Sequence, residues 1–564
     1  MKRLRDNKEL FIIIGLIVCI FMYSINMICG FSLVPDEFGY WSHAASILGI
    51  DWREVTSLGS YYSFGYSLIL MPILAIFKDG VLAYRVAIFI NFLLVVLGGI
   101  ILRRLVLNIY EGADKKQVTY VCGIAMLYPA WIFYAHMTMT EALLSFLFIL
   151  VCYLMNEFLR EEKLSIAVLL VISLFYMYVV HMRTVGIIIA AVITIVISLI
   201  RNRRLSKKAL VVLVLVIIAL IIIAMLLKGI SIKETYIEQV SNEPVVNDYS
   251  GQIGKLRLFI TPSSWWGLFN SLNGKLWYLV VASGGMTGWC VVGCVRIFNE
   301  FKGFIILAIL GQTGVAALFM NGNSSLDPFI YGRYSEHLLP VCIALGLMQV
   351  INTNHLVSIS ASMYMISGTM SLLVFSWVQK YSLSHIRGYH VAGISYLLDR
   401  ILNERDVISI SLGISMLMMT LIISIVRMTS KYKDMSFMYL VIYAIEMVGI
   451  ITLCKQNCYV ANSTNFQDKG MCEQLVSLYE EGENVGFVVD EWGTYVDFTQ
   501  MQLRDIPIRV IDAKVETNNL PISKDEYTYL IIRNDFSGQG NSKVNYVTEG
   551  YENVITGSTF NVYY

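Results

Sequence analysis

The chain has 564 residues, of which 57% are hydrophobic and 15% are charged, whereas a typical soluble domain has about 25% charged residues. This composition excludes a soluble globular protein and a disordered chain. The 42 Lys and Arg residues nearly balance the 41 Asp and Glu residues, so the net charge gives no reason to expect a nucleic-acid partner.

Apolar segments about twenty residues long recur from the N-terminus to residue 453, and such a segment crosses a bilayer core of about 30 Å as a helix. We count about thirteen of them, which predicts an α-helical polytopic membrane protein. The first, residues 10–30, has a long apolar run without a clear cleavage site of small residues. We therefore expect it to remain as a membrane anchor and not to be removed as a signal peptide.

Basic clusters predict the orientation of the chain, because loops rich in Lys and Arg stay on the cytoplasmic side. These clusters lie at the N-terminus and then in every second loop, at 103–116, 160–163, 201–208, 296–302 and 427–433. The alternation predicts a plasma-membrane protein with a cytoplasmic N-terminus and its chemistry on the outer side. The long outer loops are then 31–81, 228–275, 321–336 and 376–406.

Residues 454–564 differ in pattern from the transmembrane domain, residues 1–453. A helix-like stretch at 471–483 precedes four strand candidates, at 485–490, 506–512, 527–535 and 560–564. They predict a small extracytoplasmic α/β domain with a sheet of three or four strands. The cysteines outside apolar runs allow one disulfide and one spare thiol. They are Cys454, Cys458 and Cys472.

The first outer loop begins with two adjacent acids, Asp36 and Glu37, at the membrane boundary. Pro35 stands where a helix can begin, and Asp36, Tyr40 and His43 would then share one face of an interfacial helix. Charged groups beside the hydrocarbon layer are costly unless they are paired or functional. Taken alone, the two acids are explained equally well as favourable charges at the positive end of that helix.

Several short motifs follow one another along the chain: PDEFGYW after the first span, the aromatic segment 61–77, Thr140-Glu141, HMRTVG around Arg183, and YGRYSEHLLPV at 331–341. Their order resembles that of the polyprenyl-phosphate-dependent glycosyltransferases of the C superfamily (GT-C). That superfamily includes the protein O-mannosyltransferases and the aminoarabinose transferases of lipid A. The resemblance covers most of residues 10–345, and the order of the motifs is more specific than any single motif.

The resemblance implies a GT-C fold and the inverting transfer of a sugar from a polyprenyl phosphate to an extracytoplasmic acceptor. It implies Asp36 as the catalytic base, with Glu37 as the neighbouring candidate. Such a base accepts the proton of an acceptor hydroxyl as that hydroxyl attacks the anomeric carbon. Cations at the membrane edge would neutralise the departing lipid phosphate. The candidates for this role are Arg333, Arg183 and Lys275.

Further polar residues fall on the same side and form a second tier of site candidates: Glu141, Tyr334, His337, His43 and Tyr40. An ion pair between neighbouring spans would explain Glu141 and Arg183 equally well. Glu with His can hold a divalent metal, which makes Glu141 and His136 the candidate ligands. Relatives in this superfamily divide between metal-dependent and metal-independent members, so a metal cofactor stays an open alternative.

Two other functions remain as alternatives. A polysaccharide polymerase or ligase that uses a polyprenyl-diphosphate glycan also needs outward arginines and long outer loops, but the early pair of acids argues against it. A secondary transporter or lipid flippase needs ionisable residues near mid-membrane, whereas the spans are largely uncharged apart from Glu446. The expected partners are therefore the lipid bilayer, a polyprenyl-phosphate sugar donor and an extracytoplasmic acceptor.

Overall fold

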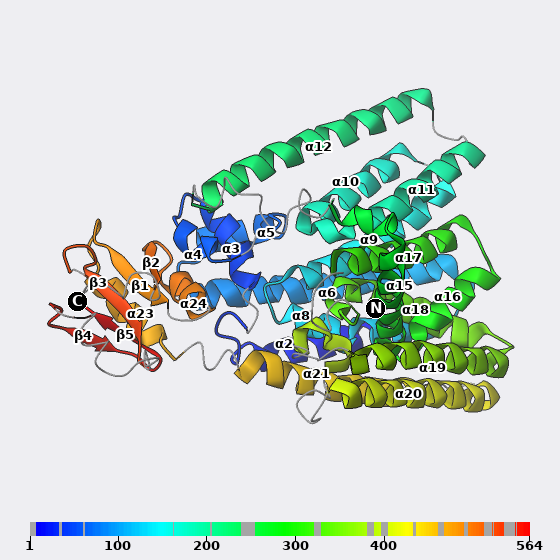
Figure 1. The fold of residues 1–564 in the computed structure, drawn as a ribbon. Coiled ribbons are helices and arrows are strands. Elements are labelled where there is room, and N and C mark those ends of the chain that lie inside the picture. Colours follow the sequence, from blue (N-terminus) through cyan, green and yellow to red (C-terminus); the bar gives the residue numbers. More distant parts are fainter. Residues whose placement is uncertain are drawn as a thin grey trace.

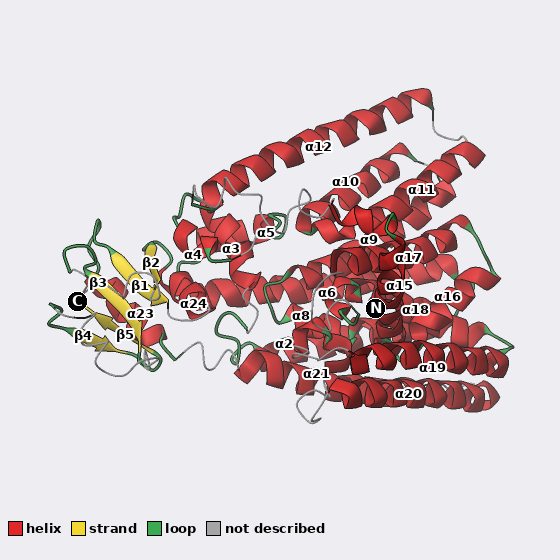
Figure 2. Cartoon of the chain, viewed as in Figure 1, coloured by secondary structure: helices red, strands yellow, loops and turns green. Residues whose placement is uncertain are grey.

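Helices form most of the molecule, and a small sheet lies at one end of the helical bundle (Figures 1 and 2). The computed structural model describes residues 7–32, 36–59, 62–161, 163–202, 206–237, 254–320, 329–380, 388–395, 404–432, 436–460, 467–489, 494–512, 522, 524–534, 548 and 550–564.

In the described residues, eight helices are long and apolar enough to cross a membrane. They are α6 (Gly80–Ile109), α9 (Thr140–Glu161), α11 (Val185–Asn202), α12 (Lys207–Thr235), α17 (Glu300–Met320), α19 (Leu356–Lys380), α20 (Glu404–Tyr432) and α21 (Ser436–Cys454). Two bent pairs raise the number to ten. They are α7 (Lys115–Met126) with α8 (Pro129–Ala135), bent by 57°, and α15 (Pro262–Ala282) with α16 (Met286–Arg296), bent by 103°.

The predicted class, an α-helical polytopic membrane protein, is confirmed, but the count of about thirteen spans is not. Several predicted spans are helices of 17 residues or fewer: α2 (Lys8–Ser24), α10 (Leu164–Val180) and α18 (Leu339–Asn352). At a rise of about 1.5 Å per residue these helices are at most about 25 Å long, which is shorter than a bilayer core of about 30 Å.

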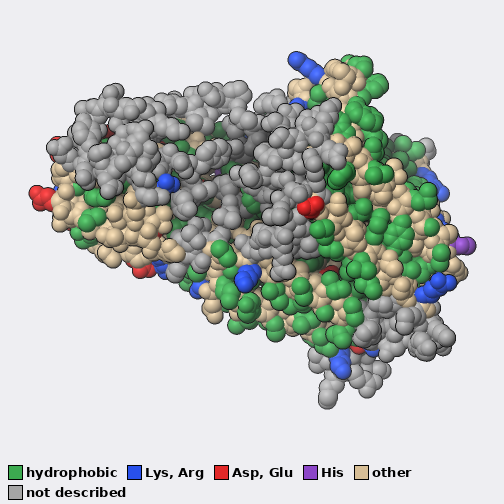
Figure 3. Space-filling model, turned by 60° about the horizontal axis from the view of Figure 1, so that its bottom comes forward, with side chains coloured by type: hydrophobic (Ala, Val, Ile, Leu, Met, Phe, Trp, Pro, Cys, Tyr) green, Lys and Arg blue, Asp and Glu red, His purple; other side chains and the backbone are tan. Residues whose placement is uncertain are grey.

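The surface of the helical part is apolar. Hydrophobic side chains cover much of it on the face shown in Figure 3, and charged side chains are sparse there. α12 is the extreme case, because only 6% of its apolar stretch is buried inside the molecule. Exposure of so many aliphatic side chains is unfavourable in water, so this surface faces lipid.

Glycines allow the close crossing of α11 and α17. A Cβ atom on Gly186 of α11 would overlap the carbonyl oxygen of Gly311 on α17. Small residues at such a crossing let two helix backbones pack tightly inside a membrane. The crossing holds the start of α11, which directly follows the 3₁₀ turn η1 (Met182–Thr184) that carries Arg183.

Three short helices fill the first long loop: α3 (Asp36–Ile47), α4 (Arg53–Ser57) and α5 (Ser67–Ile76). The predicted helix is present as α3, while Pro35, where the sequence predicts its start, lies outside the described residues. It is not an interfacial helix with a polar stripe, however. Its residues from Glu37 to Ala45 are all buried, because α5, α12 and α4 pack around it.

The predicted loop 228–275 is too long at both ends, since α12 continues to Thr235 and α15 begins at Pro262. The error arises because the polar residues at both helix ends resemble loop sequence. Parts of the predicted loops lie outside the described residues, namely 33–35, 60–61, 238–253, 321–328, 381–387 and 396–403.

The small C-terminal α/β domain is confirmed, but in the described residues its sheet has five strands, in the order β2-β1-β3-β5-β4, and not three or four. The parallel strands are β1 (Val485–Val489), β2 (Ile508–Asp512) and β3 (Tyr529–Arg533), with Val485 opposite both Ile508 and Tyr529. The antiparallel strands are β4 (Val554–Thr556) and β5 (Phe560–Tyr563). The helices are α23 (Lys469–Leu478) and α24 (Thr494–Leu503). The sequence pattern missed β4, which has only three residues, of which one is buried.

The predicted disulfide is absent, since all ten cysteines of the described structure are free thiols. Cys454 and Cys458 are buried one helical turn apart at the end of α21, and Cys472 is buried in α23. They serve as small apolar side chains in the core.

Candidate active site

Four charged side chains from distant parts of the chain meet at the start of α3. Arg333, in the 3₁₀ turn η3 (Gly332–Tyr334), donates from Nη1 to Asp36 Oδ2 at 2.6 Å and from Nε to Glu141 Oε1 at 2.7 Å. Glu141 Oε1 also accepts from Arg183 Nη2 at 2.8 Å. We call these four residues the charge network. In the charge network, the negative charges of two carboxylates balance the positive charges of two guanidinium groups.

The charge network runs from a buried end to an accessible end. The side chains of Arg183 and Glu141 are 1% and 2% exposed, whereas those of Arg333 and Asp36 are 6% and 25% exposed. Asp36 Oδ1 also accepts from the hydroxyl of Tyr62 at 3.0 Å. Asp36 is thus the acid of the network that a substrate can reach.

Two glycines make room for the tyrosines around the charge network. A Cβ atom on Gly39 would overlap the ring of Tyr62, so glycine at this position lets Tyr62 reach Asp36. A Cβ atom on Gly332 would overlap the ring of Tyr278 in the same way. The sequence motifs contain both glycines, but Tyr62 and Tyr278 were not among the predicted site residues.

A second polar cluster adjoins the first through the same turn. Glu336 Oε1 accepts hydrogen bonds from the Tyr278 hydroxyl and, at 2.8 Å, from the backbone N–H of Gly393. The side chain of Glu336 is 3% exposed. It therefore holds the chain that follows Arg333 in place and is not open to a substrate.

Glu37 has a different environment from Asp36. Its fully buried carboxylate accepts five hydrogen bonds: from Ser32 N (2.7 Å) and Oγ (2.6 Å), Tyr84 OH (2.6 Å), and Thr138 N (2.7 Å) and Oγ1 (2.8 Å). Burial raises the pKa of the Glu37 carboxyl, although the hydrogen bonds from Ser32 and Tyr84 oppose the shift. Both oxygens are occupied by protein donors, so the geometry favours Asp36 over Glu37 as the base.

We expect Glu37→Gln to destabilise the protein by about 1–3 kcal/mol, because an amide nitrogen at either oxygen position leaves buried donors without an acceptor. Thermal unfolding of the purified protein measures this loss. Glu473→Gln is the matched control, since the Glu473 carboxylate is 65% exposed. Equal unfolding temperatures for Glu37→Gln and the wild type would contradict the structural role.

The predicted cations lie at different depths. Arg183 is buried, and its guanidinium carbon lies 4.7 Å from the ring centre of Tyr334. His337 is 1% exposed and packs edge-on against Phe148. Lys275 is also 1% exposed, on α15, and the described hydrogen bonds of the charge network do not include it. Of the three predicted cations, Arg333 alone contacts Asp36 in the described structure.

His43 and Tyr40 support α3 from inside. The Nδ1 atom of His43 lies 2.6 Å from Ser231 Oγ and 3.0 Å from Thr235 Oγ1, which joins α3 to the end of α12. The ring of Tyr40 packs edge-on against Tyr62 at a centroid distance of 5.5 Å. Burial lowers the pKa of His43 to about 4, so the imidazole is neutral in the folded protein at neutral pH.

This shift predicts a pH dependence of stability. The unfolded chain binds a proton at His43 near pH 6.5, and the folded protein binds it only near pH 4, so stability falls as the pH falls between these values. The total loss in the free energy of unfolding is about 3 kcal/mol. Unfolding temperatures measured across this range for the wild type and His43→Gln check it. We expect the unfolding temperature of His43→Gln to fall less steeply with decreasing pH than that of the wild type. Parallel curves for the two proteins would contradict the assignment of this pH dependence to His43.

The candidate metal ligands Glu141 and His136 have separate partners. His136 Nε2 lies 3.2 Å from the Tyr459 hydroxyl, and its Nδ1 lies 2.7 Å from the Ile132 carbonyl oxygen. Oxygen Oε1 of Glu141 is held by two arginines. In the described part of the chain, no group of three or more His, Cys, Asp or Glu side chains is arranged to hold a metal ion. The geometry thus gives this pair no shared site.

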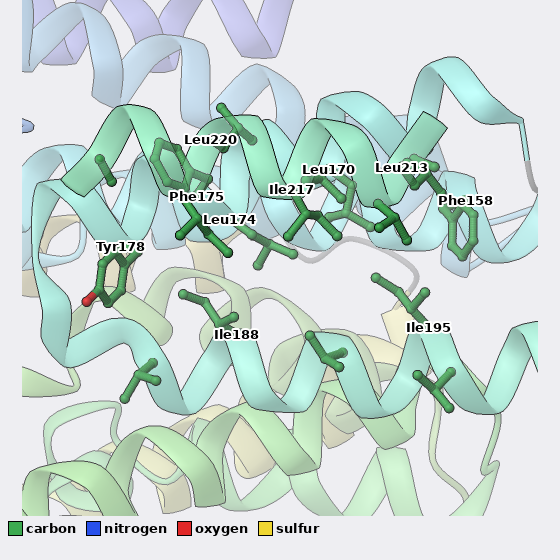
Figure 4. Close-up of a pocket in the computed structure, with 18 of the residues that line it drawn as sticks. Phe158, Leu170, Leu174, Phe175, Tyr178, Ile188, Ile195, Leu213, Ile217 and Leu220 are labelled. Atoms are coloured by element: carbon green, nitrogen blue, oxygen red, sulfur yellow. The ribbon is translucent and has the colours of Figure 1, made fainter. Parts of the chain in front are cut away.

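A cavity of about 750 Å³ opens between α10, α11 and α12. Figure 4 shows its aliphatic lining, with Tyr178 at one end and Phe158 at the other. Tyr178 and Val185, which both line the cavity, flank the turn that carries Arg183, and Lys228 of α12 lines it as well. The apolar cavity therefore reaches residues on both sides of the turn that carries Arg183. Lys228 follows an apolar run of α12 and was assigned to a loop by the sequence pattern.

No family model and no curated protein matches the sequence. The crystal structures that match the fold include ArnT from Cupriavidus metallidurans in the apo state and the same protein bound to undecaprenyl phosphate. Each has 12% sequence identity and a TM-score of 0.53. The alignments cover 98% and 99% of this chain and 97% and 98% of ArnT. The fold is GT-C-like.

The GT-C-like fold confirms the resemblance that the motifs predicted. Because the alignments extend over nearly the whole of both chains, the likeness includes the C-terminal region as well as the helices. At 12% identity the likeness concerns the fold. The reaction has to be argued from the charge network and the apolar cavity.

Proposed function

We propose that the protein is an integral membrane glycosyltransferase that moves a sugar from a polyprenyl phosphate to an extracytoplasmic acceptor. The observation that carries the proposal is an accessible carboxylate, Asp36, joined to Arg333, in a molecule whose apolar cavity is lined by residues on both sides of the turn that carries Arg183. A polyprenyl-phosphate sugar needs these three features, because its chain is apolar, its phosphate is anionic and its anomeric carbon needs an activated nucleophile. The undecaprenyl phosphate bound to ArnT belongs to this ligand class.

The chemistry assigns one role to each part of the site. Asp36 takes the proton from an acceptor hydroxyl while the hydroxyl oxygen forms a bond to the anomeric carbon. The bond between that carbon and the phosphate oxygen breaks, and the polyprenyl phosphate leaves with the electron pair. Attack from the face opposite the leaving group inverts the anomeric centre.

Arg333 is assigned to the leaving phosphate. A guanidinium group has five N–H donors, and two of those on Arg333 hold Asp36 and Glu141. The remaining donors are those we assign to phosphate oxygens, which Arg binds with its planar fork. Arg183 is too buried for this role and fixes Arg333 through Glu141. Lys228, which lines the cavity, is a better placed second cation than Lys275.

The orientation is part of the proposal. The sheet and α3 lie near one end of the bundle, and the start of α12 lies at the other end (Figure 1). The basic residues Arg201, at the end of α11, and Lys208, in the first turn of α12, belong to that other end, where Arg201 pairs with Glu300 at 3.4 Å. Basic ends stay cytoplasmic, so we place the N-terminus in the cytoplasm, and Asp36 and residues 454–564 on the outer side of the plasma membrane.

The proposal is tested with membranes that contain the protein, a panel of radiolabelled polyprenyl-phosphate sugars and an envelope extract as acceptor source. The readouts are label transfer and release of polyprenyl phosphate, and we expect both with one of the donors. Absence of transfer with every donor, from folded protein and a competent extract, would contradict the proposal. It would favour the polymerase, ligase or transporter alternatives.

A pair of variants on one helix tests the cavity. Leu213 lines it and is 9% exposed, whereas Leu215 is 59% exposed and faces lipid. We expect Leu213→Trp to fill the cavity and reduce transfer, and Leu215→Trp to leave transfer unchanged. Equal transfer by the two variants would exclude the cavity as the site of the polyprenyl chain.

A further inference from the structure

The C-terminal region reaches the first long loop through a buried tryptophan. Trp52 donates from Nε1 to the carbonyl oxygen of Arg504 at 2.6 Å. The ring of Trp52 stacks on that of Phe38, with 5.4 Å between centroids and 15° between planes. Phe38 belongs to α3 and lies two residues after Asp36. A continuous line of contacts thus connects Arg504 to the helix that carries the proposed base.

Arg504 holds the loop at a second point as well. Its Nη2 donates to the carbonyl oxygen of Leu74, in α5, at 2.9 Å. Its backbone has a φ of +36°, and among the described residues no other non-glycine residue has a positive φ. Such a conformation is strained for a non-glycine residue and persists only where the surrounding structure enforces it. The hydrogen bonds of its carbonyl oxygen and its guanidinium group hold the backbone in this conformation.

An edge of the sheet is fixed to the same loop. Glu54 of α4 accepts from Arg509 Nη1 at 2.6 Å and from the backbone N–H of Val510 at 2.8 Å, both on β2. β2 is an edge strand of the sheet. The N–H group of Val510 on this edge therefore finds its acceptor in the loop, at Glu54. The domain is therefore anchored on α4 as well as on Trp52 and α5.

We propose that Arg504 is a positioning residue that holds α3, and with it Asp36, through Trp52 and Phe38. The inference rests on the proposed role of Asp36 as base. Trp52 and Phe38 are 2% and 4% exposed, and close-packed side chains transmit a displacement instead of absorbing it. The C-terminal domain is then a part of the catalytic unit and not only a module for acceptor recognition.

The geometry of Asp36 is sensitive to such a displacement. Its two oxygens are fixed by Arg333 at 2.6 Å and by Tyr62 at 3.0 Å. A misplacement of about 1 Å in a catalytic group costs about 100-fold in rate. Loss of the support from Arg504 is therefore expected to lower kcat and to leave the KM for the donor unchanged.

Three variants of the full chain test the proposal. Trp52→Phe removes the N–H donor and keeps an aromatic ring against Phe38. Arg504→Gly removes the guanidinium group and tolerates the positive φ, whereas Arg504→Lys keeps a donor for the Leu74 carbonyl oxygen. Trp265→Phe is the control, because Trp265 is 57% exposed and lies on α15.

Hydrogen–deuterium exchange of the α3 amides is the first readout, since it does not depend on the reaction. We expect faster exchange in Trp52→Phe and Arg504→Gly, partial rescue in Arg504→Lys, and no change in Trp265→Phe. The second readout is sugar transfer, where we expect a loss of kcat of up to about 100-fold at constant donor KM.

The outcomes separate this inference from the proposed function. Unchanged exchange in α3 overturns the link between Arg504 and the helix, whether or not the protein transfers sugar. Faster exchange with unchanged kcat overturns the positioning role. If the wild type transfers no sugar, the proposed function of Asp36 fails, and with it the catalytic role of Arg504, while exchange still decides the structural link.

Discussion

Asp36→Asn is expected to reduce sugar transfer by about 100- to 10,000-fold, the usual contribution of a general base. Asparagine has nearly the same shape and still accepts a hydrogen bond from Arg333 or Tyr62, but it cannot take the proton of an acceptor hydroxyl. The measurement is label transfer together with release of polyprenyl phosphate, from membranes with equal amounts of folded protein.

Asp51→Asn is the matched control for this substitution. Asp51 lies on the same loop and pairs with Arg53 at 2.9 Å, and the two side chains are 34% and 50% exposed. We expect this variant to transfer sugar as the wild type does. Wild-type transfer by Asp36→Asn would remove Asp36 as the base and leave Glu37 and Glu141 to be tested.

Arg333→Ala is expected to have the largest effect on stability. It leaves the Asp36 and Glu141 carboxylates without the guanidinium group that joins them, and removal of one partner from a buried ion pair costs about 3–5 kcal/mol. Transfer should also be lost, because the leaving phosphate loses its cation. Thermal unfolding and label transfer measure the two effects separately.

Arg333→Lys separates charge from geometry. Lysine keeps the positive charge but lacks the planar fork that reaches two carboxylates at once, so we expect a smaller loss of stability and still a low rate of transfer. Arg53→Ala is the control, since an exposed ion pair contributes about 0–1 kcal/mol. Unfolding of Arg333→Ala at the wild-type temperature would show that the charge network does not stabilise the fold.

The features that sequence patterns predicted well are those with local causes. The length of the apolar segments predicted a polytopic helical protein, because bilayer thickness sets the length of a spanning helix. Short apolar runs predicted the strands from Val485 to Val489 and from Tyr529 to Arg533. The count of about thirteen spans is not confirmed in the described residues, because hydropathy does not show where helices such as α7 and α8 bend.

The site was predicted less completely, because it depends on contacts between residues that are far apart in the chain. Motif order identified Asp36 and Arg333, but the sequence treated Asp36 and Glu37 as neighbouring candidates for one role. Only packing separates them: Glu37 is buried under donors from Ser32, Tyr84 and Thr138.

By itself, the sequence determined that this protein lies in a membrane as a helical bundle, that a small α/β domain follows, and that Asp36 and Glu37 lie in a helix. The tertiary structure alone decided that Arg333 bridges Asp36, 297 positions away in the chain, to Glu141, and that Trp52 of the first long loop donates to the carbonyl oxygen of Arg504. The physical reason is that periodicity and capping act over a few residues. Contacts across hundreds of residues depend on which surfaces can pack closely, such as Gly39 against Tyr62 and Gly186 against Gly311.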